Sequence, residues 1–107
     1  MKELLAFVKA ENVKTRAWIK AAPGRAAGLY PEDEAYWIER GISTIAELER
    51  DQLINFIYDG HKDAYGFRNR GYDFDSMSMA ELEAEADRIS DAIEAENKRM
   101  DEMYARN

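Results

Sequence analysis

The 107-residue sequence contains no cysteine and a single histidine. Without thiols the chain forms no disulfide, no thiolate metal site and no cysteine nucleophile, and this composition suits a reducing cytosol. No apolar run approaches the ~20 residues that cross a bilayer. The opening stretch MKELLAFVKAENVK breaks its apolar residues with charges, unlike a secretory signal. We therefore expect no membrane span, no signal peptide and a location in the cytoplasm.

The sequence also lacks the common catalytic and metal-binding patterns. It contains no P-loop, no Rossmann glycine motif and no G-x-S-x-G motif. His61, Lys62 and Asp63 are consecutive, so on a helix they point about 100° apart and do not converge on one reacting atom. We expect no catalytic residue, no metal ligand and no cofactor. An enzyme is kept as a third hypothesis, and the only reason for it is that the single histidine, His61, lies among aromatic residues.

The net charge of −7 is unevenly distributed. Residues 1–30 carry six basic and two acidic side chains, a balance of +4, which leaves −11 for the other 77 residues. An acidic chain is poorly suited to non-specific nucleic-acid binding, because that binding depends on neutralising phosphates. Because the first third of the chain is basic, a local basic patch that binds nucleic acid remains an alternative.

The composition favours helices. The chain is rich in Ala, Glu, Leu and Met, which are strong helix formers, and it has only two prolines. The first helix is predicted over residues 2–21, although Asn12 and Thr15 interrupt its apolar stripe. The second is predicted to begin with Pro31 at its first position and to end at Gly41.

Two glycines and a capping pattern define the third predicted helix. The sequence TIAE at residues 44–47 has the form of a capping box and opens the helix. Gly66 is the natural residue to end it. An internal Gly60 costs about 1 kcal/mol relative to alanine, so a break there is the alternative.

Ser76 or Ser78 is predicted to cap a last helix that runs to about Tyr104 and is roughly 40 Å long. The expected fold is all-α, with three N-terminal helices in a small bundle and a long coiled-coil-like helix at the C-terminus. Within a single domain, we assign residues 1–75 to a compact helical unit and residues 76–107 to the long acidic helix.

Apolar residues along the last helix step by three and four, which is the a/d pattern of a heptad repeat. The first interpretation is that the stripe packs on the protein's own first three helices. The second is a homodimer, in which an antiparallel pairing of two copies would place Met79 opposite Met103 and Leu82 opposite Met100, and the third is docking on another protein. The predicted interface residues are Met79, Leu82, Ile89, Ile93, Met100 and Met103.

A second line at helical spacing on this helix consists of carboxylates. Such a line can imitate phosphates and occupy a nucleic-acid-binding protein. The alternative is a solvated acidic face. The four residues are Glu83, Asp87, Asp91 and Glu94.

The stretch HKDAYGFRNRGYDF at residues 61–74 interleaves aromatic rings and guanidiniums. One interpretation is a structural corner, in which the aromatics close the end of the bundle. The other is a surface for a partner or ligand, since arginine beside aromatics is common in binding hot spots. The candidate residues are Tyr65, Phe67, Arg68, Arg70 and Tyr72.

Three features together resemble small accessory proteins of tailed bacteriophages and prophages. They are AYWIERGIST, then HKDAYGFRNRGYDF, then a serine-capped acidic helix. That group often has the pattern K-D-x-Y-G-x-R-P-R, and Asn69 stands here in place of the proline. The resemblance covers about residues 30 to 100. It implies an infection setting, the host bacterial cytoplasm and a non-virion accessory role.

Two functions follow as hypotheses. The leading one is a non-catalytic factor that binds a host or phage protein, as a phage modulator or inhibitor that acts by occlusion. It would use either Arg68 and Arg70 with the aromatic residues around them, or the line of four carboxylates on the last helix. The alternative is a small nucleic-acid-binding module. Its basic residues would be Lys9, Lys14, Arg16, Lys20, Arg68 and Arg70.

Overall fold

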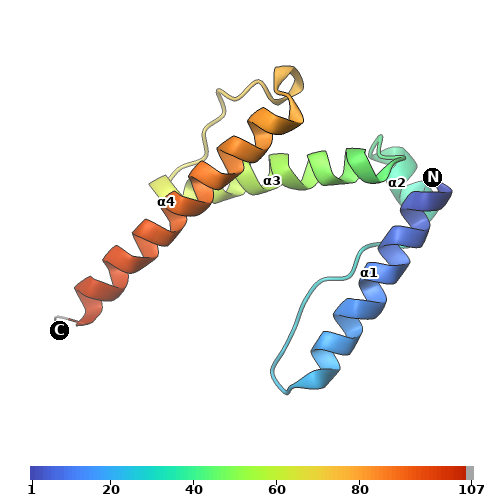
Figure 1. The fold of residues 1–107 in the computed structure, drawn as a ribbon, viewed down its shortest axis with the longest axis horizontal. Helices are drawn as coiled ribbons and strands as arrows, with labels where there is room; N and C mark the ends of the chain where they lie inside the picture. The colour runs from blue at the N-terminus through green and yellow to red at the C-terminus, as the bar shows by residue number, and fades with distance from the viewer. Residues whose placement is uncertain (106–107) are drawn as a thin grey trace. The chain divides into compact units, whose positions relative to one another are not determined.

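The computed structural model describes residues 1–105 and confirms the all-α prediction (Figure 1). Within these residues the chain forms four α-helices and one short 3-10 turn, and no strand. None of the helices in this part of the chain is long and apolar enough to cross a membrane. The elements are α1 (Lys2–Ala21), α2 (Glu34–Glu39), α3 (Ile45–Tyr65), η1 (Phe74–Ser76) and α4 (Met79–Ala105).

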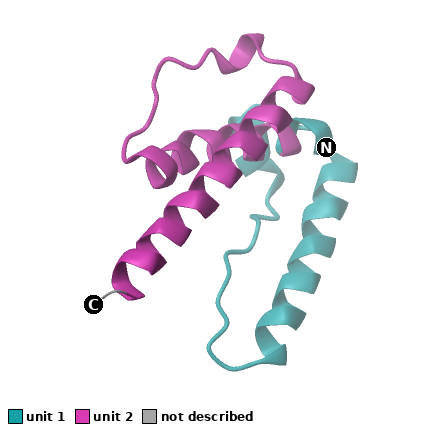
Figure 2. Ribbon diagram, turned by 60° about the vertical axis from the view of Figure 1, so that its left-hand side comes forward, with its two compact units in different colours: residues 1–48 teal, residues 49–107 magenta. Residues whose placement is uncertain are grey.

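The chain forms two compact units, Met1–Leu48 and Glu49–Asn107 (Figure 2). The division falls within α3, whereas the boundary expected from the sequence lay between residues 75 and 76. The packing of α4 explains this difference, because α4 buries its apolar stripe against the part of α3 that follows residue 48. The long helix therefore belongs to the core of the second unit.

In the first unit, α1 begins and ends where the sequence predicts. Leu4 and Val8 are completely buried on one face of α1, and Trp37 of α2 packs in the same cluster. Burial of apolar surface stabilises a fold by about 25 cal/mol per Å². Complete burial of a leucine or valine side chain therefore contributes about 1.5–3 kcal/mol to the stability of the fold. The buried cluster consists of Leu4, Val8, Trp37, Ile42 and Leu48.

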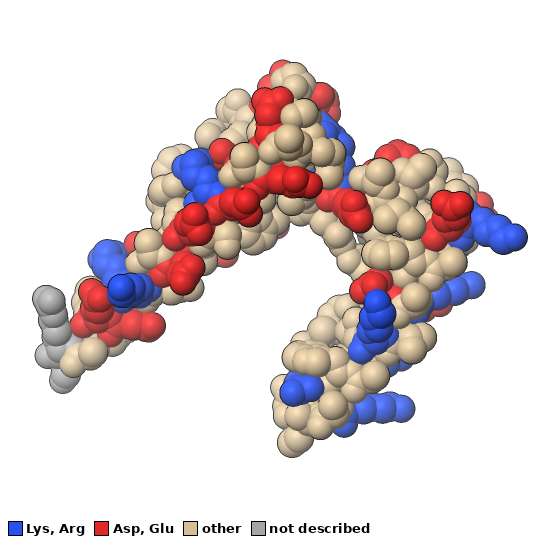
Figure 3. All heavy atoms as spheres, viewed as in Figure 1, with Lys and Arg blue, Asp and Glu red and all other residues tan. Residues whose placement is uncertain are grey.

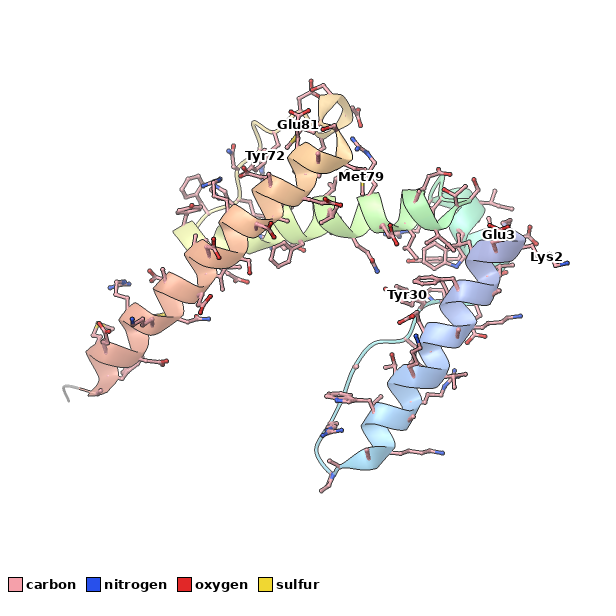
Figure 4. The ribbon with its side chains drawn as sticks, in the orientation of Figure 1. Lys2, Glu3, Tyr30, Tyr72, Met79 and Glu81 are labelled. Carbon is pink, nitrogen blue, oxygen red and sulfur yellow. The ribbon has the colours of Figure 1, made fainter. Side chains whose placement is uncertain are left out.

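Asn12, which interrupts the apolar stripe in the sequence, is 1% exposed. Its Oδ1 accepts a hydrogen bond from the Tyr30 amide at 2.8 Å. Its Nδ2 donates to the Tyr30 carbonyl at 2.8 Å and to a Glu32 carboxylate oxygen at 2.9 Å. The side chain thus pairs with backbone as a neighbouring strand would, and it holds the extended segment that contains Tyr30 beside α1 (Figure 4).

The predicted start of the second helix is wrong by three residues. The helix begins at Glu34, and Asp33 is its N-cap, since Asp33 Oδ1 accepts a hydrogen bond from the Ala35 amide at 3.2 Å. Pro31 lies before the helix, and its carbonyl accepts a hydrogen bond from Trp37 Nε1 at 2.8 Å. The Trp37 indole N–H therefore has a part-buried hydrogen-bond partner, and the cap at Asp33 sets the start of the helix after Pro31. Gly41 ends the turn with φ +71°, as predicted.

The predicted caps of α3 and α4 are found. Thr44 Oγ1 accepts a hydrogen bond from the Glu47 amide at 3.1 Å, which places α3 where the capping pattern predicts. Ser78, not Ser76, caps α4. Ser78 Oγ accepts from the Glu81 amide at 3.1 Å, and a Glu81 carboxylate oxygen accepts from the Ser78 amide at 3.2 Å. Both halves of a capping box are therefore formed, with Glu81 in the first turn of α4 (Figure 4).

Helix α3 runs through Gly60 without a break. A Cβ at this position would lie 2.8 Å from Ile89 Cγ2 and 3.4 Å from Ile93 Cδ1 of α4. The missing side chain therefore allows α3 and α4 to approach closely, which offsets the cost of an internal glycine. The second buried cluster forms around this contact and consists of Ile57, Leu82, Ala86 and Ile89.

We predict that Asn12→Ala destabilises the protein by about 1–3 kcal/mol, because it removes three hydrogen bonds made by a buried side chain. The measurement is the urea midpoint followed by circular dichroism. Val13→Ala is the matched control on the same helix, since Val13 is 64% exposed, and we expect a change within about 0.5 kcal/mol. Equal effects of the two substitutions would show that the Asn12 hydrogen bonds do not stabilise the first unit.

Candidate functional site

The stretch at residues 61–74, which interleaves aromatic rings and arginines, comprises the end of α3 and most of its connection to α4 in the second unit. Helix α3 ends at Tyr65. The next residue, Gly66, has φ +88°, and its amide donates to the Lys62 carbonyl at 2.8 Å. A positive φ is accessible to glycine at little cost, so the chain turns away from the helix here. We call residues 65–74 the corner.

His61 fixes the beginning of the corner through a hydrogen bond and ring contacts. Its ring is 6% exposed, and Nδ1 lies 2.5 Å from the Phe67 carbonyl oxygen. Because a carbonyl only accepts, Nδ1 carries the hydrogen and donates it. The imidazole also packs against Tyr65 and Phe67, with ring centroids 4.7 and 4.8 Å away. His61 therefore acts here as a packed group that fixes backbone.

The end of the corner is held by stacking and by Arg50. The rings of Tyr72 and Phe74 stack with centroids 5.0 Å apart. One Arg50 nitrogen donates to the Phe74 carbonyl at 2.6 Å and to the Met77 carbonyl at 2.7 Å. An irregular segment must pair its buried carbonyls with side chains or water, and Arg50 meets that need. This anchor was not anticipated from the sequence.

A hydrogen-bond network ties the corner to α4. The Tyr72 hydroxyl donates to Glu85 Oε1 at 2.6 Å, and Arg88 makes a short, forked ion pair with the same carboxylate. Arg88 Nη1 also donates to the Tyr65 hydroxyl oxygen at 2.7 Å. Tyr72 lies on the corner beside α4 (Figure 4). Glu85 and Arg88 are i, i+3 neighbours in the sequence, but only the fold brings them to the two tyrosines.

The network shifts the pKa values of its members. The hydrogen bond from Arg88 lowers the pKa of Glu85 below its usual value of 4.5, and the bond from Tyr72 adds to this effect. Burial raises the pKa of Tyr72 above 10.0, and the neighbouring Glu85 carboxylate raises it further. The Glu85 carboxylate in turn raises the pKa of Arg88. At neutral pH the network therefore holds the Glu85 carboxylate, the Arg88 guanidinium and a neutral Tyr72.

The outer side of the corner presents Phe67, Arg68 and Arg70, which this network does not use. Phe67 is 61% exposed, and Tyr65, whose hydroxyl belongs to the network, is 44% exposed. Arg68 Nε donates to Asp59 Oδ1 at 3.2 Å, and the Arg68 guanidinium lies over the Tyr58 ring. Arg70 is exposed and forms no ion pair within residues 1–105. Of the two arginines predicted to bind, Arg70 is thus the more available.

Asn69 also contributes to the shape of the corner. Its Oδ1 accepts a hydrogen bond from the Gly71 amide at 2.8 Å. This is an Asx-type turn, in which a short side chain takes the place of a backbone carbonyl. Asn69 therefore restricts the turn by a hydrogen bond at the position where the resembling group often has proline.

The heptad stripe of α4 divides into two parts. Leu82 and Ile89 are completely buried against α3, whereas Met100 and Met103 are 37% and 48% exposed. The other two predicted interface residues, Met79 and Ile93, pack half-buried against the same core. In this conformation the first half of the stripe is used within the chain, and only the last turns of α4 keep an apolar face for another molecule.

The acidic line lies on the exposed side of α4. Glu83, Asp87, Asp91 and Glu94 are all exposed, and none of them forms an ion pair in the part of the chain that the structure describes. Acidic side chains follow α4 along the face seen in Figure 3. The carboxylates are therefore hydrated and available to cations of another molecule.

The basic residues proposed for nucleic-acid binding are divided between the two units. Arg68 and Arg70 belong to the corner, and the other four lie on α1 in the first unit. On α1 the spacing places Lys9, Arg16 and Lys20 on one face, with Lys14 on another side. Lys14 pairs with Glu11 at 3.3 Å.

Among residues 1–105 no group of three histidine or carboxylate side chains lies close enough together to hold a metal ion. Comparisons with family models, with curated proteins and with solved structures found no match to this chain.

We predict that Glu85→Gln lowers stability by about 1 kcal/mol at neutral pH, because the charged hydrogen bonds with half-exposed Arg88 are lost. The folded-state pKa of Glu85 is depressed, so its contribution is present above about pH 4.5 and is lost as the pH falls through the lower folded value. The difference between wild type and Glu85→Gln should therefore shrink below about pH 4.5.

The measurement is a series of urea midpoints between pH 3 and pH 7, with Glu83→Gln as the control. Glu83 is exposed and forms no ion pair within residues 1–105, so this variant should follow the wild-type curve. A Glu85→Gln difference that stays constant down to pH 3 would contradict the role of the ionised carboxylate.

Proposed function

We propose that this protein is a non-catalytic accessory factor of a tailed bacteriophage that binds a host protein in the bacterial cytoplasm and inhibits it by occlusion. The binding surface is the outer side of the corner, and the acidic line of α4 is a second surface on the same unit. The phage setting comes from the sequence resemblance, and the protein-binding role comes from the construction of the corner.

The observation that carries the proposal is an irregular segment that is anchored at both ends and exposes large side chains between the anchors. His61 fixes the Phe67 carbonyl, and Arg50 fixes the Phe74 carbonyl. At the first anchor the Phe67 side chain is 61% exposed, and between the anchors Arg70 is exposed without an ion pair among residues 1–105. A large aromatic and a free guanidinium are hot-spot residues in protein interfaces.

Anchoring matters because binding must offset the entropy lost when loops and side chains become ordered. Each immobilised side chain costs about 0.5–1.5 kcal/mol on association. A segment that is already held by backbone hydrogen bonds loses less, so its exposed groups contribute more to affinity. The Tyr72–Glu85 hydrogen bond at 2.6 Å adds a third anchor within the corner.

The acidic line supports occlusion of a basic surface. Its four unpaired carboxylates would attract a patch of lysine and arginine on a partner and repel nucleic acid from it. Charge complementarity of this kind increases the association rate and selects among partners more than it adds affinity. Phe67 and Arg70 would then supply most of the binding energy.

We predict that the double variant Phe67→Ala/Arg70→Ala binds its host partner at least about thirtyfold more weakly than wild type, since a hot spot is worth about 2 kcal/mol or more. The measurement is affinity capture from bacterial lysate, followed by titration of the captured protein. The matched control is Ile38→Ala/Lys62→Ala, which removes an apolar side chain that is 61% exposed and an exposed cation, neither of them among residues 65–74.

A triple charge reversal, Glu83→Lys/Asp87→Lys/Asp91→Lys, tests the acidic line separately, with an expected slower association and a weaker salt dependence. Undiminished capture by both the corner variant and the charge-reversed variant would refute the proposal. Loss of capture by the control variant alone would also refute it, because the surface would then lie elsewhere.

Nucleic-acid binding is the second candidate, favoured by the common exposed face of Lys9, Arg16 and Lys20 on α1 and by Trp18, which is 49% exposed. We predict that any shift of single-stranded DNA or RNA in a gel is weakened by Lys9→Ala/Lys20→Ala and declines steeply between about 50 and 200 mM salt. Absence of a shift at the lowest salt removes this candidate and leaves the protein-binding proposal unaffected.

A further inference from the structure

A line of basic residues runs the length of α1 on its exposed side. The spacing from Lys2 to Lys9, to Arg16 and to Lys20 is seven, seven and four residues. Intervals of seven and four return to nearly the same side of a helix, so the four side chains form one line. We call these residues the basic line. All four are exposed, and Lys2 projects from the start of α1 (Figure 4).

The basic line is largely unpaired within the chain. Only Arg16 has an ionic partner among residues 1–105, at 3.6 Å from a Glu32 oxygen. Lys2, Lys9 and Lys20 form no ion pair in the same part of the chain. The exposed pair of Arg16 with Glu32 is individually worth under ~1 kcal/mol, so it can exchange partners at little cost.

The exposed side of α4 carries acids with the same intervals in the reverse direction. The spacing from Asp101 back to Glu94, to Asp87 and to Glu83 is seven, seven and four residues. All four side chains are exposed and unpaired within residues 1–105. Three of them belong to the acidic line already described, and Asp101 extends it toward the C-terminus.

The two sets match only when the helices run in opposite directions. One antiparallel register places Lys2 opposite Asp101, Lys9 opposite Glu94, Arg16 opposite Asp87 and Lys20 opposite Glu83. The four pairs extend over 18 residue steps, from Lys2 to Lys20, which is about 27 Å of helix at 1.5 Å per residue.

Other registers match less well. The best parallel register forms three such pairs and leaves Lys20 opposite Ala105. In the antiparallel register Asp91 lies opposite buried Asn12, so Asp91 gains no pair. No two like charges face each other in that register.

Small residues beside both lines leave room for two helices to approach. Ala6 lies four residues after Lys2 and three before Lys9, Ala17 lies three before Lys20, and Ala84 lies three before Asp87, so these exposed alanines flank the two lines. Helix axes can then reach the usual separation of about 8–10 Å, at which facing long side chains form ion pairs. No apolar seam is needed for such a contact.

We propose that α1 of one copy binds α4 of a second copy in this antiparallel register, through four ion pairs. The protein therefore self-associates weakly and in a salt-dependent way, and the second copy covers part of the acidic line when no other partner is present. The inference concerns a surface that the proposed function also uses, but it does not depend on that function. It is tested on purified protein alone, so either proposal can fail without the other.

The test uses two charge-reversed variants. The acid-reversed variant is Glu83→Lys/Asp87→Lys/Glu94→Lys, and the base-reversed variant is Lys9→Glu/Arg16→Glu/Lys20→Glu. Sedimentation equilibrium should show that wild-type protein self-associates and that the dissociation constant rises roughly tenfold or more from about 50 to 500 mM NaCl, as expected for screened surface charges. Each variant alone should be monomeric, because its lines repel.

An equimolar mixture of the two variants should associate again. In the mixture the unchanged basic line of one variant meets the unchanged acids of the other, and the two reversed lines also attract. A control with the net charge of the base-reversed variant, Lys14→Glu/Arg25→Glu/Lys62→Glu, should keep self-associating at low salt, because these residues lie off the line. Circular dichroism of every variant shows whether its helices are retained.

Several outcomes would overturn the proposal. Wild-type protein that stays monomeric at low salt and millimolar concentration would do so, as would folded variants that remain monomeric when mixed. Association that survives both charge reversals but is lost in Met100→Glu/Met103→Glu would assign the contact to the apolar end of α4 instead. A salt effect that is independent of protein concentration would also exclude a second copy.

Discussion

The close approach of α3 and α4 at Gly60 is the contact on which the second unit depends. A side chain at that position would overlap Ile89, and without the contact the apolar stripe of α4 would have no cover from α3. The contact also orients the rest of α4. Once Leu82 and Ile89 face α3, the carboxylates on the opposite side must face solvent, because an α-helix presents residues about half a turn apart to opposite sides.

Both units fasten their irregular segments with polar side chains from a neighbouring helix. In the first unit, Asn12 pairs with the backbone of Tyr30. In the second, His61 and Arg50 bind carbonyls of the corner. Buried backbone groups require partners, and these segments form no ladder of their own. The same hydrogen bonds hold the backbone on both sides of the exposed part of the corner, so the fold and the proposed binding surface depend on the same contacts.

The two proposals describe surfaces with different physical character. The corner combines an exposed aromatic ring with a guanidinium, and its contribution would be affinity. The charged lines of α1 and α4 are long and exposed, and they would contribute weak, salt-sensitive contacts. A protein with both kinds of surface can meet a partner through charge and hold it through the corner. Self-association would then compete only for the charged part.

The sequence alone determined the all-α class, the bounds of α1 and the capping of α3, and it limited the cap of α4 to Ser76 or Ser78, because these depend on residues within one or two turns. It also located the exposed acidic line. The tertiary structure decided what Asn12, Gly60 and Arg50 do, since each acts on a partner at least 18 residues away. It likewise decided that the first half of the α4 stripe packs within the chain. Periodicity identifies an apolar face, but only packing identifies the surface that covers it.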